Sequence, residues 1–247
     1  MKSGVYSLET VGINSTELGG KAKNLAKLIQ NRFPVPTGFI ITLEAFHHGE
    51  LKLSAISEIE NLIKLEKLYA VRSSAIAEDA QNESWAGQFE SFLNVLAKEV
   101  IEKVVKCHNS KKARALAYGG KTQDFGIAVI VQEMLKPDYA GVIFTRNPVT
   151  GADEMVTEFI EGLGEDLVGG RKDPNQIIIR KNKEIPKYPF DFEKLYSMAN
   201  EILTVFDGIP QDIEYAVVND EIYILQSRPI TTNISSDETR IELGLPE

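Results

Sequence analysis

The segment from Pro210 to Pro229 constrains the fold more than any other, because its β-branched and aromatic residues predict two strands around a turn at Asn219-Asp220. Side chains alternate between the two faces of a strand, so the length of the loop decides which of them share a face. A two-residue turn would point Glu214 and Gln226 to opposite faces. A three-residue loop over Asn219–Glu221 would place Glu214 directly opposite Gln226.

We favour the three-residue loop, in which Val218 pairs with Ile222, because it also brings Arg228 to the face of Glu214 and Gln226. An acid, an amide and a guanidinium then meet at one end of an otherwise apolar face. Oxygen donors beside a cation suit a polyphosphate that carries Mg²⁺. The alternative is a hairpin with merely solvated polar ends, and the hairpin alone does not decide between the two.

Composition limits the classes of protein to which the chain can belong. Its 247 residues suffice for one large domain or two small lobes. A formal net charge of −9, without a basic run, argues against a nucleic-acid partner. The longest apolar run, Ile127 to Val131, is too short to span a membrane, and Met1 to Gly4 start no signal segment. With the single Cys107, these features predict a soluble cytoplasmic protein.

Hydrophobic periodicity predicts a two-lobed α/β (α+β) fold, with a helix-rich lobe over residues 1–125, a strand-rich lobe over 126–232 and a polar tail over 233–247. A helix of roughly three turns begins at Gly19-Gly20-Lys21 and ends before Pro34. Clefts between lobes are favoured places for ligands. Further helices are predicted over 43–48, 54–68, 98–108, 110–118 and 191–206, and strands over 39–42, 69–74, 89–95, 127–132, 141–145, 155–160 and 176–180.

Two segments of the first lobe have the chemistry of a phosphate site. Gly19-Gly20-Lys21 places a cation and accessible backbone at a helix start, where free N–H groups favour anions, although it can equally be an ordinary turn and cap. Arg72 lies where a strand meets a polar loop, residues 75–88, in which Gly87 would let the backbone approach a phosphate. The alternative for Arg72 is a structural ion pair with Glu78 or Asp79.

Other segments carry weaker signals. The backbone of Gln132-Glu133-Met134-Leu135, after a buried strand, could bind the edge of an adenine, although a methionine is more often a core residue. The glycine-rich segment Glu161–Gly170 does not have the spacing of a dinucleotide fingerprint and is expected to be a mobile loop near phosphates. His47, His48 and His108 fall in predicted helices and do not cluster at metal-ligand spacing.

Taken together, the ordered motifs resemble the N-terminal nucleotide-binding domain of phosphoenolpyruvate synthase and pyruvate phosphate dikinase, which has an ATP-grasp-like fold. They follow the family's order from end to end of the chain. The matching segments are Leu18–Leu25, Pro34–Thr42, Val71–Asp79, Trp85–Gln88, Val131-Gln132, Gly141–Thr145, Asn147–Gly151, Gly162–Glu165, Pro210–Glu214 and Leu225–Ile230.

The resemblance implies a role for each matching residue. Phosphoryl chemistry needs mainly positioning and charge neutralisation, so Lys21, Arg72 and Arg228 would be the catalytic cations. The hairpin residues Glu214 and Gln226 would bind Mg²⁺, in agreement with the register favoured above. The residues implied in ATP binding are Lys21, Arg72, Gly87, Ser91 (where threonine is usual), Gln132, Glu133, Leu135 and Arg228.

The chain also departs from the family. Family enzymes continue into a swivelling domain whose histidine carries the phosphoryl group, whereas this chain ends soon after Arg228. The resemblance therefore implies a module that passes phosphates of ATP to a carrier histidine on a missing domain or a partner, leaving AMP. The alternatives are a non-catalytic nucleotide-binding regulatory subunit, which shortened segments after Ile41 and Gly170 would favour, and part of an antibiotic-type dikinase.

Overall fold

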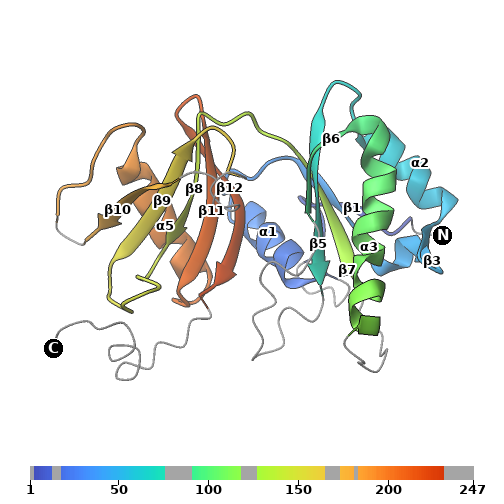
Figure 1. Ribbon diagram of the computed structural model, residues 1–247, viewed down its shortest axis with the longest axis horizontal. Coiled ribbons are helices and arrows are strands. Elements are labelled where there is room, and N and C mark those ends of the chain that lie inside the picture. The colour runs from blue at the N-terminus through green and yellow to red at the C-terminus, as the bar shows by residue number, and fades with distance from the viewer. Residues whose placement is uncertain are drawn as a thin grey trace. The chain divides into compact units, whose positions relative to one another are not determined.

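The chain divides into two compact units, Met1–Leu135 and Lys136–Glu247, shown as ribbons in Figure 1. The computed structural model describes residues 3–12, 18–75, 91–117, 127–164, 173–180 and 183–230, without the side chains of 75 and 111–117. The division falls after Leu135 and not at the predicted 125/126. The reason is that the strand over 127–133 hydrogen-bonds to two strands of the first unit and so belongs to its sheet.

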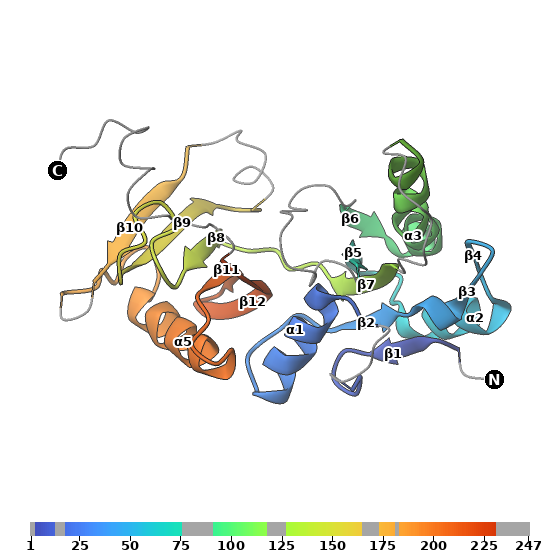
Figure 2. The ribbon, with the colours of Figure 1, turned by 90° about the horizontal axis from the view of Figure 1, so that it is seen from below.

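The first unit is an antiparallel sheet covered by helices on both faces. Its strand order is β1-β2-β7-β5-β6, where β1 is Val5–Ser7, β2 is Gly38–Ile41, β5 is Leu68–Ala75, β6 is Ser91–Leu96 and β7 is Ile127–Glu133. One face packs on α1 (Gly20–Gln30) through a core that includes Leu25, Ile40 and Ile130. The other face packs on α2 (Leu53–Leu62) and α3 (Val100–Ala117). Figure 2 shows α1 and α3 on opposite sides of the sheet.

Four predicted helices of this unit differ from the structure. Residues 43–48 form the short 3-10 turn η1 (Leu43–Ala45) and the hairpin of β3 (Phe46–His47) with β4 (Glu50–Leu51). The predicted helix over 54–68 ends at Leu62, because the backbone turns extended at Ile63 and the N–H of Lys64 donates to the Tyr69 hydroxyl at 2.7 Å. The two helices predicted over 98–118 are η3 (Ala97–Glu99) running into the single helix α3.

The second unit is a five-stranded antiparallel sheet with a helix on one face. Its strand order is β10-β9-β8-β11-β12, where β8 is Tyr139–Phe144, β9 is Met155–Glu161, β10 is Asn175–Ile179, β11 is Gln211–Val218 and β12 is Glu221–Pro229. The helix α5 (Phe192–Val205) starts at Asp191, whose side chain accepts a hydrogen bond from the N–H of Lys194 at 3.0 Å. Aromatic rings of Phe159, Phe190 and Phe192 pack between helix and sheet. The predicted α+β class is confirmed.

The β11–β12 hairpin corrects the predicted register. Its loop is a two-residue turn at Asn219-Asp220, with Val218 opposite Glu221, and not the predicted three-residue loop. Both turn residues have positive φ, 49° and 64°, which suits the tight turns that follow the twist of a hairpin. A β-bulge then leaves Leu225 between two consecutive pairs, so that Glu214 still lies opposite Gln226. The extra residue predicted in the loop is in β12 instead.

Candidate functional site

Four polar side chains share one face of the second sheet. Glu214 lies opposite Gln226, and Asp212 lies opposite Arg228 two residues further along the ladder. Because side chains alternate along a strand, these four point away from the face on which α5 packs. Gln226 is 6% exposed and Asp212 9%, so the site is partly buried in the sheet. The structure therefore brings the predicted Glu214, Gln226 and Arg228 together.

Asp212 was not among the predicted site residues, although it precedes Glu214 by two positions and so had to share its face. The Nε and Nη2 atoms of Arg228 lie 2.8 Å and 2.7 Å from Oδ2 of Asp212. Burial raises the pKa of Asp212, the neighbouring Arg228 lowers it, and the charge of Glu214 adds a smaller increase. Arg228, predicted to pair with phosphate, thus has a carboxylate partner within the second unit.

The raised pKa of Asp212 predicts how the free energy of unfolding changes with pH. Its pKa in the folded protein is raised, so the folded state binds the proton more tightly than the unfolded state. Stability from this group is therefore greatest below the unfolded pKa, about 3.9, and falls as the pH rises through the folded pKa. The free energy of unfolding of the wild type, relative to Asp212→Asn, should decrease as the pH rises above about 4. Urea denaturation at a series of pH values measures this, and a constant difference would contradict it.

The residues on this face fit a magnesium site in which a bound phosphate compound supplies some of the ligands. Mg²⁺ prefers oxygen ligands and usually takes one or two carboxylates, with waters and phosphates completing its shell. Glu214 supplies a carboxylate and Gln226 an amide oxygen from the opposite strand. Among the described residues, no group of three or more His, Cys, Asp or Glu side chains could hold a metal without other ligands.

The first unit gathers a second set of predicted residues on the α1 face of its sheet. Arg72 lies opposite Ser91 of β6 on one side and Ile130 of β7 on the other. Ile130 belongs to the core beneath α1, so Arg72 and Ser91 face α1 as well. Gln132, two residues beyond Ile130, shares this face and is 4% exposed.

The start of α1 is tied to the same strand as Arg72. The N–H of Ala22, next to Lys21, donates to the Ser74 hydroxyl at 3.1 Å, and both residues are buried. Gly19 occupies the cap position without a side-chain hydrogen bond. The predicted Lys21 therefore lies in the first helical turn, next to the end of the strand that carries Arg72. Gly87 and its polar loop lie outside the described residues.

The segment predicted to contact adenine is held by the first unit. The N–H of Glu133 donates to the Thr37 carbonyl, and the N–H of Met134 to the Leu68 carbonyl, both at 2.8 Å. The Glu133 carboxylate lies 3.1 Å from the Lys67 ammonium. Two of the three N–H groups from Glu133 to Leu135 are thus used within the unit.

The histidines do not form a site in the described part of the chain. His47 lies in β3 and His48 in the turn after it, not in helices, whereas His108 lies in α3 as predicted. The His108 ring stacks on Phe46 with centroids 3.6 Å apart, and its Nδ1 lies 2.9 Å from the Ile127 carbonyl oxygen.

Among the described residues, no helix combines the length and the apolar character that crossing a bilayer demands.

Comparisons with known proteins agree with the motifs. Residues 49–188, more than half of the chain, match the family described as pyruvate phosphate dikinase, AMP/ATP-binding domain, and the chain belongs to this family. It is 32% identical to a probable phosphoenolpyruvate synthase of Archaeoglobus fulgidus and 30% identical to one of Methanothermobacter thermautotrophicus, over 87% and 91% of its length. It spans only 40% and 45% of these relatives. The predicted family is confirmed.

Further similar proteins include a rifampicin phosphotransferase of Bacillus cereus, 32% identical over 68% of this chain and 24% of that protein. Among solved structures, D-alanyl-alanine synthetase A from Vibrio cholerae has a TM-score of 0.47 at 10% identity and covers 95% of this chain and 62% of that one.

Proposed function

We propose that the chain is the Mg-ATP-binding module of a phosphotransferase of the phosphoenolpyruvate synthase and pyruvate phosphate dikinase type. The observation that carries the proposal is the register of β11 and β12, which sets Glu214 opposite Gln226 beside the Asp212–Arg228 pair. Membership of an AMP/ATP-binding domain family supports the nucleotide as its ligand.

The first unit carries the residues that the proposal assigns to the phosphates and the adenine. Lys21, Arg72 and Ser91 of the first unit, with Gly87, bind the phosphates, since cations and hydroxyls neutralise and orient phosphate oxygens. Backbone groups of Gln132, Glu133 and Leu135 hold the adenine. Leu135 is the best candidate for an N–H donor, because the N–H groups of Glu133 and Met134 are already used.

The hairpin supplies the metal ligands and a further cation. Glu214 and Gln226 would hold Mg²⁺, which neutralises phosphate charge when it is bound. Arg228, oriented by Asp212, would bind a phosphate oxygen, and Lys21 and Arg72 would stabilise the charge that develops during transfer.

The reaction in this proposal needs an acceptor histidine on a carrier domain. An imidazole nitrogen of a carrier domain attacks the β-phosphorus of ATP and loses its proton. The bond between the β-phosphorus and the oxygen that bridges to the α-phosphorus breaks, so AMP leaves and the histidine carries the two terminal phosphates. The final acceptor is pyruvate in one version of the proposal and an antibiotic in the other. The rifampicin phosphotransferase relative supports the version with an antibiotic.

The experiment mixes the chain with ATP, Mg²⁺ and the isolated histidine-carrier domain of a relative. AMP and an acid-labile phosphohistidine should form together, in equal amounts, and neither should form without the carrier domain. Chromatography of the nucleotides and radiolabel from β-labelled ATP measure the two products. ADP as the sole nucleotide product would contradict the dikinase chemistry, and tight ATP binding without either product would favour the regulatory subunit.

A further inference from the structure

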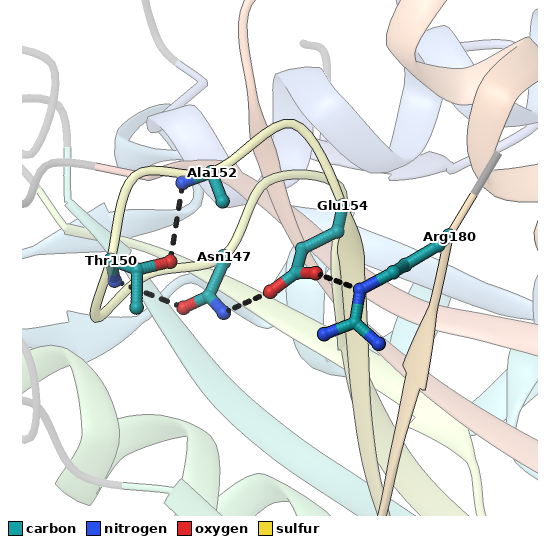
Figure 3. A network of polar contacts seen from close by, with 5 residues as sticks. All are labelled: Asn147, Thr150, Ala152, Glu154 and Arg180. Carbon is teal, nitrogen blue, oxygen red and sulfur yellow. Dashed lines mark hydrogen bonds and ion pairs between the residues drawn. The ribbon is translucent and has the colours of Figure 1, made fainter.

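The loop between β8 and β9 is more tightly built than a connection between two strands requires. The Asn147 side-chain oxygen accepts hydrogen bonds from the N–H groups of Val149 and Thr150, at 3.0 Å and 3.1 Å. Its side-chain nitrogen donates to Oε1 of Glu154 at 2.8 Å. The Thr150 hydroxyl accepts from the N–H of Ala152 at 3.2 Å, which completes the network in Figure 3.

A residue next to a third strand holds this network. Arg180, directly after β10, donates from Nε to Oε2 of Glu154 at 2.8 Å. The Glu154 side chain is 12% exposed, so its charge is largely removed from water, and each of its two oxygens has a partner (Figure 3). Charge-assisted hydrogen bonds of this kind are stronger than neutral ones, so Asn147 is firmly held.

Arg146 lies between two anchored residues. Before it, the Thr145 hydroxyl accepts from the N–H of Gln211 at 2.7 Å, and the N–H of Thr145 donates to the Gln211 carbonyl at 2.9 Å. After it comes Asn147, which is 7% exposed. Arg146 itself is exposed, and within the described residues its side chain has neither an ion pair nor a hydrogen bond.

The anchored arginine lies at the same end of the sheet as the candidate site. Phe144 of β8 is opposite Asp212, which is opposite Arg228, and Arg146 follows Phe144 by two residues. The charge of Arg228 is compensated by Asp212. An anion at this end of the sheet therefore meets, in Arg146, a guanidinium that no carboxylate of the described residues compensates.

We infer that Arg146 binds a phosphoryl group at this end of the second sheet, an inference that rests on the proposed function. A guanidinium offers phosphate two parallel N–H donors and keeps its charge at every physiological pH. Because the backbone on both sides is already fixed, binding has only the side chain left to order, which lowers its entropic cost. An arginine that served solubility alone would not need these anchors.

The test compares Arg146→Gln and Arg146→Lys with a matched control, Arg32→Gln, which alters an exposed arginine of the first unit. Calorimetry measures the Kd of ATP, ADP, AMP and inorganic phosphate, each with and without Mg²⁺, and thermal unfolding checks that the variants fold. Arg146→Gln should weaken ATP binding by about tenfold or more, equal to about 1.4 kcal/mol, and leave AMP binding unchanged. Arg146→Lys should fall between it and the wild type, and Arg32→Gln should match the wild type.

The ligands separate the possible sources of the phosphoryl group. Weaker binding of ATP and ADP but not of AMP supports a contact with the terminal phosphates of the nucleotide. Weaker binding of inorganic phosphate alone supports a contact with a phosphate from another source. Unchanged Kd values for all four ligands, or an equal loss for AMP, would overturn the inference. A wild type that binds no ATP refutes the proposed function instead, while the inorganic phosphate arm still tests Arg146.

Discussion

Replacing Glu214 with glutamine is expected to reduce AMP formation by roughly a hundredfold, which corresponds to about 2.7 kcal/mol of transition-state stabilisation. Glutamine keeps the size of the side chain and an oxygen, but it removes the only carboxylate of the Glu214–Gln226 pair. Mg²⁺ binds a neutral amide more weakly than a carboxylate, so the phosphate charge is less well neutralised. The measurement is the rate of AMP release in the presence of the carrier domain, together with the Mg²⁺ dependence of ATP binding.

The sheet itself offers the matched control. Glu158 of β9 lies on the same row of the ladder as Glu214, with Val142 of β8 between them, so both carboxylates are on one face. Glu158 accepts a hydrogen bond from the Gln176 side chain at 2.9 Å, and its strand is three positions from that of Gln226 in the sheet. Glu158→Gln should therefore leave AMP formation close to the wild type. A Glu214→Gln variant as active as Glu158→Gln would rule out Glu214 as a metal ligand.

The hairpin shows which part of a site can be predicted from residue order alone. The requirement that Glu214 and Gln226 share a face needed one extra residue somewhere between them, and the prediction placed it in the loop. Asn219 and Asp220 both tolerate positive φ, so the two-residue turn was the better local choice. The bulge at Leu225 depends on how β12 fits the twist of β11, which no local signal in its sequence reveals.

The first unit shows a second limit, because periodicity located elements better than their ends. The predicted helix continued to Leu68, whereas α2 ends at Leu62, where the backbone becomes extended at Ile63 and the N–H of Lys64 donates to the Tyr69 hydroxyl. The strand β7 was correctly predicted, but its partners β2 and β5 come from far along the chain, so its unit could not be assigned from sequence. Pairing between distant strands decides the second point.

The candidate site combines both kinds of information. Strand alternation alone places Asp212 with Glu214, whereas the Asp212–Arg228 ion pair depends on the observed register of the hairpin. Similarly, Arg72 was predicted from its place at a strand end and Ser91 through the resemblance, and their position opposite one another follows from the pairing of β5 with β6. The motifs therefore selected the candidate residues, and the sheets determine which of them lie opposite one another.

Replacing Gly141 with alanine is expected to destabilise the protein by about 3 kcal/mol, at the upper end of what overpacking a core usually costs. Gly141 lies in β8 between Tyr215 of β11 and Phe159 of β9. A Cβ there would lie 2.8 Å from the Tyr215 hydroxyl oxygen and 2.9 Å from Cβ of Phe159, and closer still to the carbonyl oxygen of Glu158. Backbone of a paired strand cannot move aside without breaking the ladder, so the clash persists. Urea denaturation measures the loss.

The same change should also weaken nucleotide binding, because it acts on the strand that carries the site. Tyr215 is buried and directly follows Glu214, and its hydroxyl lies 2.9 Å from that of Thr157 in β9. Displacing Tyr215 would therefore shift Glu214 relative to Gln226. Gly12→Ala is the control, since no atom lies within 4 Å of a Cβ added there, and its effect should stay within about 0.5 kcal/mol. If both variants unfold at the same urea concentration as the wild type, the close packing around Gly141 does not support the site.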